Sequence, residues 1–178
     1  FGTSLNIIVL YRIYSDISYT FGKRKEREER GMPKNLVERK IDSLYERRSM
    51  GVDTVLFGVL NGKFSEGVDY SENVLSALVC VGLPLPPPSA KQDALLEYYS
   101  KKYDRNRAWR YASLQPAVNS ILQALGRPIR KKEDRAIVVL LEKRLLERRV
   151  GDCMPAMQKM RTSKPERTAE RVKAFFEI

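Results

Sequence analysis

Four short apolar runs constrain what this chain can fold into more than any other feature. They are LNIIVLY, TVLFGVL, LSALVCVGLP and AIVVLLEKR, at residues 5–11, 54–60, 75–84 and 136–144. Each is too short to span a bilayer, and continuous apolar runs of this kind are typical of buried strands. Stretches with the apolar spacing of amphipathic helices separate them. Buried strands that alternate with helices predict an α/β fold, a mainly parallel sheet with helices on both faces.

The segments between these runs are expected to complete a single domain over residues 1–178. Helices are expected at 34–48, 91–103 and 113–125, and a helical tail at about 150–178. The charged stretch GKRKEREERGMP, at 22–33, is interpreted as a solvated and mobile segment. The stretch DRNRAWRY, which precedes the third helix, is interpreted as a basic and aromatic loop.

Composition narrows the chemistry that this chain can perform. Its 178 residues include no histidine, which excludes acid–base catalysis and metal binding by that side chain. Two cysteines are too few for a four-cysteine zinc or iron–sulfur site, so no metal site is expected. The net charge of +11 favours nucleic acid, nucleotide or an acidic membrane, and we expect one of the first two. We expect no membrane partner, and a cytoplasmic, nucleoid-associated protein, or a nuclear one in a eukaryote.

The stretch GKFSEGVDY, at 62–70, follows the second apolar run. Its glycines frame Lys63, Ser65 and Glu66 at the expected carboxyl end of a parallel strand, where open α/β sheets bind ligands. Turned backbone amides at such a place can form an anion-binding nest. The alternative is a strand-to-helix turn whose glycines serve only geometry. The phosphate-binding pattern GxxxxGK[ST] does not occur in the chain.

The stretch QALGRPIRKKED joins a predicted helix to the last apolar run. We expect the helix to end at Gly126 in the left-handed conformation. Arg127 and Arg130 then supply two guanidinium groups, which suit phosphate and stabilise charge on a transferring phosphoryl group. Gln123 lies one helical turn earlier, and Asp134 is placed to orient one arginine. The alternative is a solvated basic helix end that the helix dipole favours.

The stretch YDRNRAWRY, at 103–111, interleaves arginines with Tyr103, Trp109 and Tyr111. Aromatic side chains among cations bind single-stranded nucleic acid without sequence preference, because bases stack on the rings. Alternatively, the rings of Trp109 and Tyr111 pack beneath the helix that follows.

Three stretches, in this order, resemble the second motor domain of XPD/DinG-type superfamily 2 DNA helicases, and we expect an archaeal XPD. They are VLFGVLNGKFSEGVDY, VLSALVCVGLPLPPPS and QALGRPIRKKEDRAIVVLLEKR, within about residues 50–145. The family's motif V reads GKxSEGxD, here at 62–70, and its motif VI reads QxxGRxxR, here at 123–134. The resemblance implies a RecA-like three-layer domain of the P-loop NTPase type. Three features depart from the family: the opening FGTS, the poor match at 12–33, and Pro128 between the arginines.

The resemblance also implies a nucleotide site. ATP with Mg²⁺ would bind between this domain and a first motor domain, which in the family also holds the iron–sulfur cluster. Arg127 and Arg130 would be the catalytic arginines, with Arg130 the preferred arginine finger. Gln123 and Gly126 would lie beside the nucleotide. Alone, the chain is not expected to hydrolyse ATP.

For DNA, the resemblance implies that Gly67 and Asp69 link the nucleotide site to the DNA groove. Lys63, Ser65 and Glu66 would face single-stranded DNA. The expected function is that of a 5′-to-3′ DNA repair helicase. Two alternatives are a non-catalytic RecA-like adaptor, which would have no use for the arginine pair, and a basic nucleic-acid-binding module without nucleotide.

Overall fold

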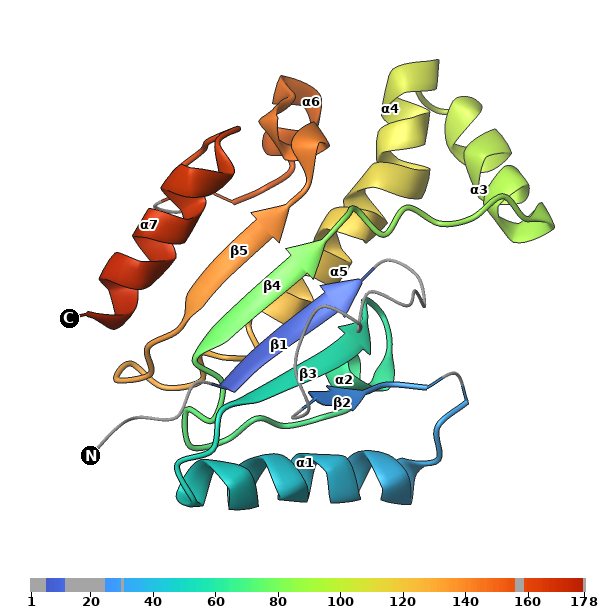
Figure 1. Ribbon diagram of the computed structural model, residues 1–178. Helices are drawn as coiled ribbons and strands as arrows, with labels where there is room; N and C mark the ends of the chain where they lie inside the picture. The colour runs from blue at the N-terminus through green and yellow to red at the C-terminus, as the bar shows by residue number, and fades with distance from the viewer. Residues whose placement is uncertain (1–5, 12–24, 30, 156–158, 178) are drawn as a thin grey trace.

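Five strands form one sheet in the computed structural model, which describes residues 6–11, 25–29, 31–155 and 159–177 (Figure 1). They are β1 (Asn6–Tyr11), β2 (Lys25–Arg27), β3 (Thr54–Val59), β4 (Ala77–Val81) and β5 (Ile137–Leu141). Their order is β2-β3-β1-β4-β5, and every neighbouring pair is parallel. The predicted parallel sheet is confirmed, and each of the four predicted apolar runs contains a strand.

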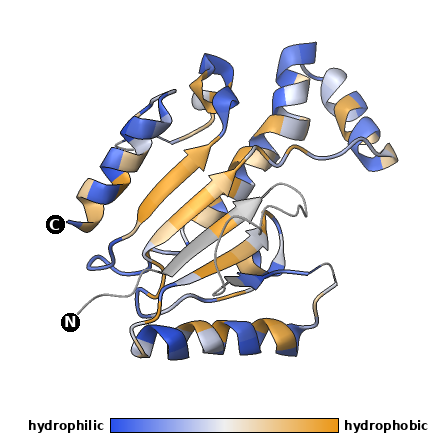
Figure 2. Cartoon of the chain, viewed as in Figure 1, coloured by the Kyte–Doolittle hydropathy of each residue, from blue (hydrophilic) through white to orange (hydrophobic). Residues whose placement is uncertain are grey.

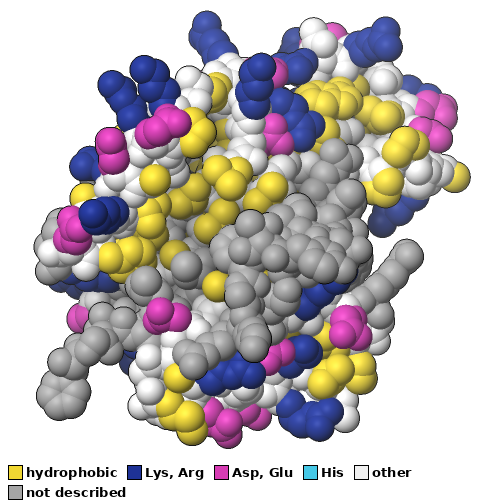
Figure 3. Space-filling view, in the orientation of Figure 1, with side chains coloured by type: hydrophobic (Ala, Val, Ile, Leu, Met, Phe, Trp, Pro, Cys, Tyr) yellow, Lys and Arg dark blue, Asp and Glu magenta, His cyan; other side chains and the backbone are white. Residues whose placement is uncertain are grey.

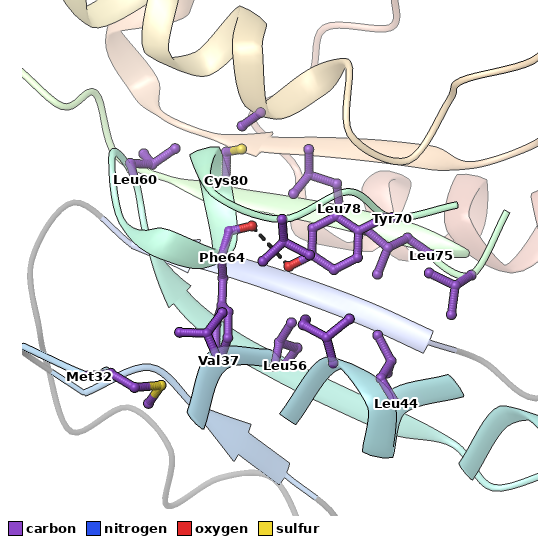
Figure 4. Packing of buried hydrophobic residues seen from close by; sticks show 14 residues of the cluster. Met32, Val37, Leu44, Leu56, Leu60, Phe64, Tyr70, Leu75, Leu78 and Cys80 are labelled. Atoms are coloured by element: carbon purple, nitrogen blue, oxygen red, sulfur yellow. Dashed lines mark hydrogen bonds between the residues drawn. The ribbon is translucent and has the colours of Figure 1, made fainter. Parts of the chain in front are cut away.

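One core cluster joins the sheet to α1 (Lys34–Ser49), α2 (Lys63–Glu66) and the end of α5 (Gln115–Leu125). The three predicted apolar positions of α1 are all buried in it, namely Val37, Ile41 and Leu44. The cluster also contains Leu56 of β3 and Phe64 of α2, and Figure 4 shows Val37 and Leu44 on the side of α1 that faces these residues. Apolar residues three and four positions apart therefore set which face of α1 meets the sheet.

The strand β2 lies within the charged segment that we interpreted as solvated and mobile. That interpretation is wrong for the described part of the segment. β2 pairs with β3, and Glu28, which follows it, is only 3% exposed. Glu26 forms ion pairs with Lys40 and Arg47 of α1, each at 2.8 Å. Because α1 supplies cations to this carboxylate, a charged sequence can form a strand here.

A helical arm projects beyond the carboxyl ends of the strands, at the upper right of Figure 1. It consists of α3 (Ala90–Ser100), α4 (Arg105–Trp109) and a π-helix (Arg110–Leu114) that continues into α5. The predicted loop at DRNRAWRY is therefore wrong. Asp104 begins α4 by accepting hydrogen bonds from the backbone N–H groups of Asn106 and Arg107. Leu114 and Val118 then pack in a second core cluster.

The tail contains a 3₁₀ helix (Lys143–Leu146), α6 (Arg148–Gly151) and α7 (Pro165–Phe176). α7 lies beside β5, at the opposite edge of the sheet from β2 (Figure 1). Figure 2 shows that apolar residues dominate β4 and β5, whereas the outer helices alternate apolar and polar residues. Among the described helices, none is both long and apolar enough to cross a membrane.

Candidate functional site: the 62–70 loop and the 123–134 segment

The 62–70 loop starts just beyond the carboxyl end of β3, and α2 is its first turn. Ser65 lies inside it and is 2% exposed. Its hydroxyl Oγ lies 3.0 Å from the carbonyl oxygen of Val59 and 2.9 Å from that of Gly62, and can donate to either. In this structure the Ser65 side chain holds the loop against the strand end and does not face outward.

The two other polar residues of α2 lie at the surface. Lys63 and Glu66 are exposed, and the Lys63 ammonium group donates a hydrogen bond to the carbonyl oxygen of Met32. Beneath them, the buried Tyr70 hydroxyl donates to the carbonyl oxygen of Phe64 at 2.9 Å, the dashed line in Figure 4. Burial, together with the charge of nearby Glu28, raises the pKa of Tyr70, so this hydroxyl stays a donor.

Gly126 follows the last residue of α5 with a φ of −76°, which is right-handed. The expected left-handed stop is wrong, because the Arg127 N–H bonds to the Ala124 carbonyl oxygen at 3.0 Å in a tightened right-handed turn. Gly126 and Gln123 are both exposed at this helix end. Gly67 is exposed in the facing loop.

Arg127 joins the 123–134 segment to the 62–70 loop. Its Nη1 donates to the carbonyl oxygen of Val68 at 2.9 Å, and its Nη2 donates to that of Glu66 at 2.7 Å. Its Nε is buried and has no hydrogen-bond partner among the described residues. Two stretches that are 59 and 61 positions apart in sequence are thus linked by one guanidinium fork.

Arg130 lies at the surface, where its Nη2 is 3.0 Å from Oδ1 of Asp69. The two side chains are 42% and 75% exposed. Asp134 accepts from the backbone N–H groups of Arg130 and Lys131, each at 2.8 Å, and these bonds lower the pKa of Asp134. Asp134 therefore fixes the backbone of Arg130, while Asp69 pairs with the guanidinium group.

The two aromatic residues named for DNA binding have different environments. Trp109 packs against the second core cluster, with the guanidinium carbon of Arg149 5.6 Å from the ring centroid. Tyr111 is 40% exposed, and its ring centroid lies 5.6 Å from that of Tyr99 and 5.0 Å from that of Tyr103. Tyr103 belongs to the stretch identified from sequence, whereas Tyr99 of α3 was not identified. Figure 3 shows Lys and Arg side chains along the upper rim of the molecule, over this arm and α6.

Glu28 belongs to the same site, and no sequence pattern pointed to it. Its carboxylate accepts hydrogen bonds from the backbone N–H groups of Val59 and Lys63. A run of alternating charges does not indicate which of its residues is buried. Only the parallel pairing of β2 with β3 brings Glu28 to the loop. Within the described residues, no group of three or more Cys, Asp or Glu side chains could hold a metal ion.

The family model described as "Helicase C-terminal domain" matches residues 6–161. The chain belongs to that family. Among similar proteins, an ATP-dependent DNA helicase XPD from Sulfolobus acidocaldarius is 34% identical over 107 residues, covering 58% of this chain and 19% of that protein. An ATP-dependent DNA helicase DinG from Photobacterium profundum is 32% identical over 104 residues, covering 58% of this chain and 15% of that protein. This member of the helicase C-terminal domain family thus spans about a fifth or less of the length of these relatives.

Solved structures agree with the family. A structure titled XPD helicase superposes with a TM-score of 0.65 at 26% identity, covering 85% of this chain and 27% of that chain. The resemblance to XPD/DinG-type helicases and the RecA-like α/β fold are both confirmed.

Proposed function

We propose that this chain is the second motor domain of an ATP-dependent 5′-to-3′ DNA helicase of the XPD type that acts in DNA repair. One observation carries the proposal: Arg127 binds the 62–70 loop while Arg130 stays at the surface beside Asp69. The relatives named above are ATP-dependent DNA helicases, which supports ATP and DNA as the ligands. The substrate ATP, with Mg²⁺, would occupy a cleft shared with a first motor domain.

The two arginines have different roles in this proposal. Both terminal nitrogens of Arg127 donate to loop carbonyls, so Arg127 is a positioning residue. Arg130 is the arginine finger, because an exposed ion pair such as that with Asp69 is worth at most about 1 kcal/mol and can be exchanged for phosphate oxygens. Its guanidinium group would then stabilise charge on the transferring phosphoryl group. Gln123 and Gly126 lie beside the same nucleotide, and any iron–sulfur cluster belongs to the first motor domain.

DNA contacts are assigned to the exposed residues of the loop and the arm. Lys63 and Glu66 face the single-stranded DNA. Gly67 and Asp69 connect the DNA groove to the nucleotide site. Ser65 supports the loop from inside. A net charge of +11 favours a single-stranded DNA backbone in this position. Such a protein works where DNA is, in the cytoplasm of a prokaryote or in a eukaryotic nucleus.

The finger assignment is tested by Arg130→Ala in a polypeptide that contains this chain and a first motor domain. Turnover of ATP stimulated by single-stranded DNA should fall by about 10³-fold or more, as when an arginine finger is lost. Arg171→Ala is the matched control, because this arginine is exposed on α7 and lies outside both the 62–70 loop and the 123–134 segment. Equal turnover in the two variants would contradict the finger assignment and favour a non-catalytic adaptor.

A further inference from the structure

Glu28 is the buried carboxylate that follows β2. Its backbone N–H bonds to the Phe57 carbonyl oxygen at 2.7 Å, which extends the pairing of β2 with β3 and fixes where the side chain starts. From there one carboxylate oxygen accepts from the Val59 N–H at 3.0 Å, and the other accepts from the Lys63 N–H at 2.6 Å. These two amides lie on either side of the turn that connects β3 to α2.

The carboxylate supplies a cap that α2 does not provide for itself. Gly62 is the N-cap residue of α2 and has no side chain to accept from the first free N–H groups. Glu28, from another element, accepts from the first of them, that of Lys63. Bonds from amides to an ionised acceptor are roughly twice as strong as neutral ones, so this cap ties the turn firmly to β2.

Gly62 is required because of this close approach. A Cβ atom at this position would lie 2.5 Å and 2.7 Å from the two carboxylate oxygens of Glu28, and 2.7 Å from the Val59 carbonyl oxygen. Its φ of −89° is open to any residue, so the backbone conformation does not demand glycine. The missing side chain makes room for the carboxylate.

The far end of the same loop is held by the opposite charge. Arg127 donates to the carbonyl oxygens of Glu66 and Val68, and Val68 immediately precedes Asp69. Glu28 therefore holds the loop by its amides and Arg127 holds it by its carbonyls. Lys63 lies at the first of these two clamps, and Asp69 follows directly after the second.

We propose that Glu28 is a positioning residue for the 62–70 loop. It sets where the exposed Lys63 and Asp69 stand relative to Arg130 without touching substrate itself. The expected effect of Glu28 on turnover rests on the proposed function, whereas its effect on the loop does not.

Hydrogen exchange tests the effect on the loop without any assay of activity. In Glu28→Gln the side chain keeps its size, but it loses its charge and turns an amide donor toward one of the two N–H groups. Exchange at the Val59 and Lys63 amides should rise by about tenfold or more. Glu29→Gln removes the same charge from the exposed neighbour and should leave both rates unchanged.

Turnover then separates positioning from mere stability. In the polypeptide with both motor domains, with ATP and a poly(dT) oligonucleotide, Glu28→Gln should lower kcat by about tenfold and change the KM for ATP by less than about twofold. The comparison is made per folded molecule, well below the unfolding midpoint. Glu28→Asp keeps the charge on a shorter side chain and should recover part of both the exchange protection and kcat.

The outcomes are distinguishable. Loop exchange and kcat equal to those of Glu29→Gln would overturn the positioning role. If Glu28→Gln does not fold, the same two measurements on Glu28→Asp decide, and wild-type values in both would overturn it. If the unsubstituted protein shows no ATP turnover stimulated by DNA, the proposed function fails, while the exchange result still judges the effect of Glu28 on the loop.

Discussion

Arg127 and Arg130 lie three positions apart in the 123–134 segment but have different surroundings. Arg127 is partly buried, and its planar fork matches two carbonyl oxygens at once. Arg130 is exposed, and its pairing with Asp69 is screened by water. The tight turn after α5 separates the two side chains, so that one fixes the loop and the other remains available to a ligand.

At this scale we predict that Arg127→Lys destabilises the protein. One ammonium group cannot replace both guanidinium bonds, so one of the two loop carbonyls loses its charged donor, and the free energy of unfolding should fall by about 1–3 kcal/mol. Denaturation in urea measures this change. Arg171→Lys, at an exposed position on α7, should stay within about 0.5 kcal/mol of wild type. A similar effect for both substitutions would mean that the Arg127 bonds add nothing to stability.

Among the elements, the arm of α3, α4 and the π-helix departs most from expectation. A stretch rich in arginine and aromatic residues was expected to be a loop, yet Asp104 caps it and the helix runs on into α5. The packing of α3 against the π-helix gathers Tyr99, Tyr103 and Tyr111 into one ring cluster with centroids 5.0–6.3 Å apart. Tyr103 and Tyr111 are each 40% exposed, so the cluster offers ring faces that a base could stack on.

We predict that Tyr111→Ala weakens binding of a poly(dT) oligonucleotide by about 1–3 kcal/mol, the usual contribution of one base–aromatic stack. Fluorescence anisotropy with a labelled oligonucleotide measures the affinity. Phe176→Ala removes an aromatic ring of comparable exposure from α7 and should leave the affinity unchanged. Should both substitutions weaken binding equally, the arm is not a stacking platform.

For the whole molecule, two partly buried carboxylates, Glu26 and Glu142, make stability depend on pH. Burial raises the pKa of Glu26, but the hydrogen bonds and charges of Lys40 and Arg47 outweigh it and hold the pKa below its ordinary value of 4.5. The side-chain hydrogen bonds from Arg144 likewise lower the pKa of Glu142, more than burial raises it. Groups with a depressed folded pKa stabilise the protein fully above their unfolded pKa. This contribution is lost as pH falls through the lower folded value.

We therefore predict that the unfolding midpoint falls as the pH drops below about 4.5. With no histidine in the chain, it should change little between about pH 5.5 and pH 8. Thermal unfolding followed by circular dichroism, at pH values from below about 4.5 up to about 8, measures both regions. Glu26→Gln should weaken the acid dependence, because the substituted side chain has no proton to gain. An unchanged acid limb would show that the Glu26 ion pairs do not contribute.

Local pattern was enough to predict the four apolar strands, the buried face of α1 and the two stretches that form the candidate site. Burial periodicity, turn residues and motif spacing each depend on residues that are close together in the sequence. They can therefore be recognised without knowing which segments meet in the folded protein. The proximity of the 62–70 loop to the 123–134 segment was implied by the family resemblance. The resemblance did not imply which groups Arg127 and Arg130 bind within this chain.

Which residues hold the loop depended on chain segments that meet only after folding. Glu28 reaches Val59 and Lys63 from 31 and 35 positions away, and Arg127 reaches Val68 from 59 positions away. Glu28 and Glu29 look alike in the sequence, yet one is buried against backbone amides and the other is exposed. Whether a carboxylate accepts hydrogen bonds from backbone amides or stays in solvent depends on which strand pairs beside it. The residues adjacent in the sequence do not contain that information.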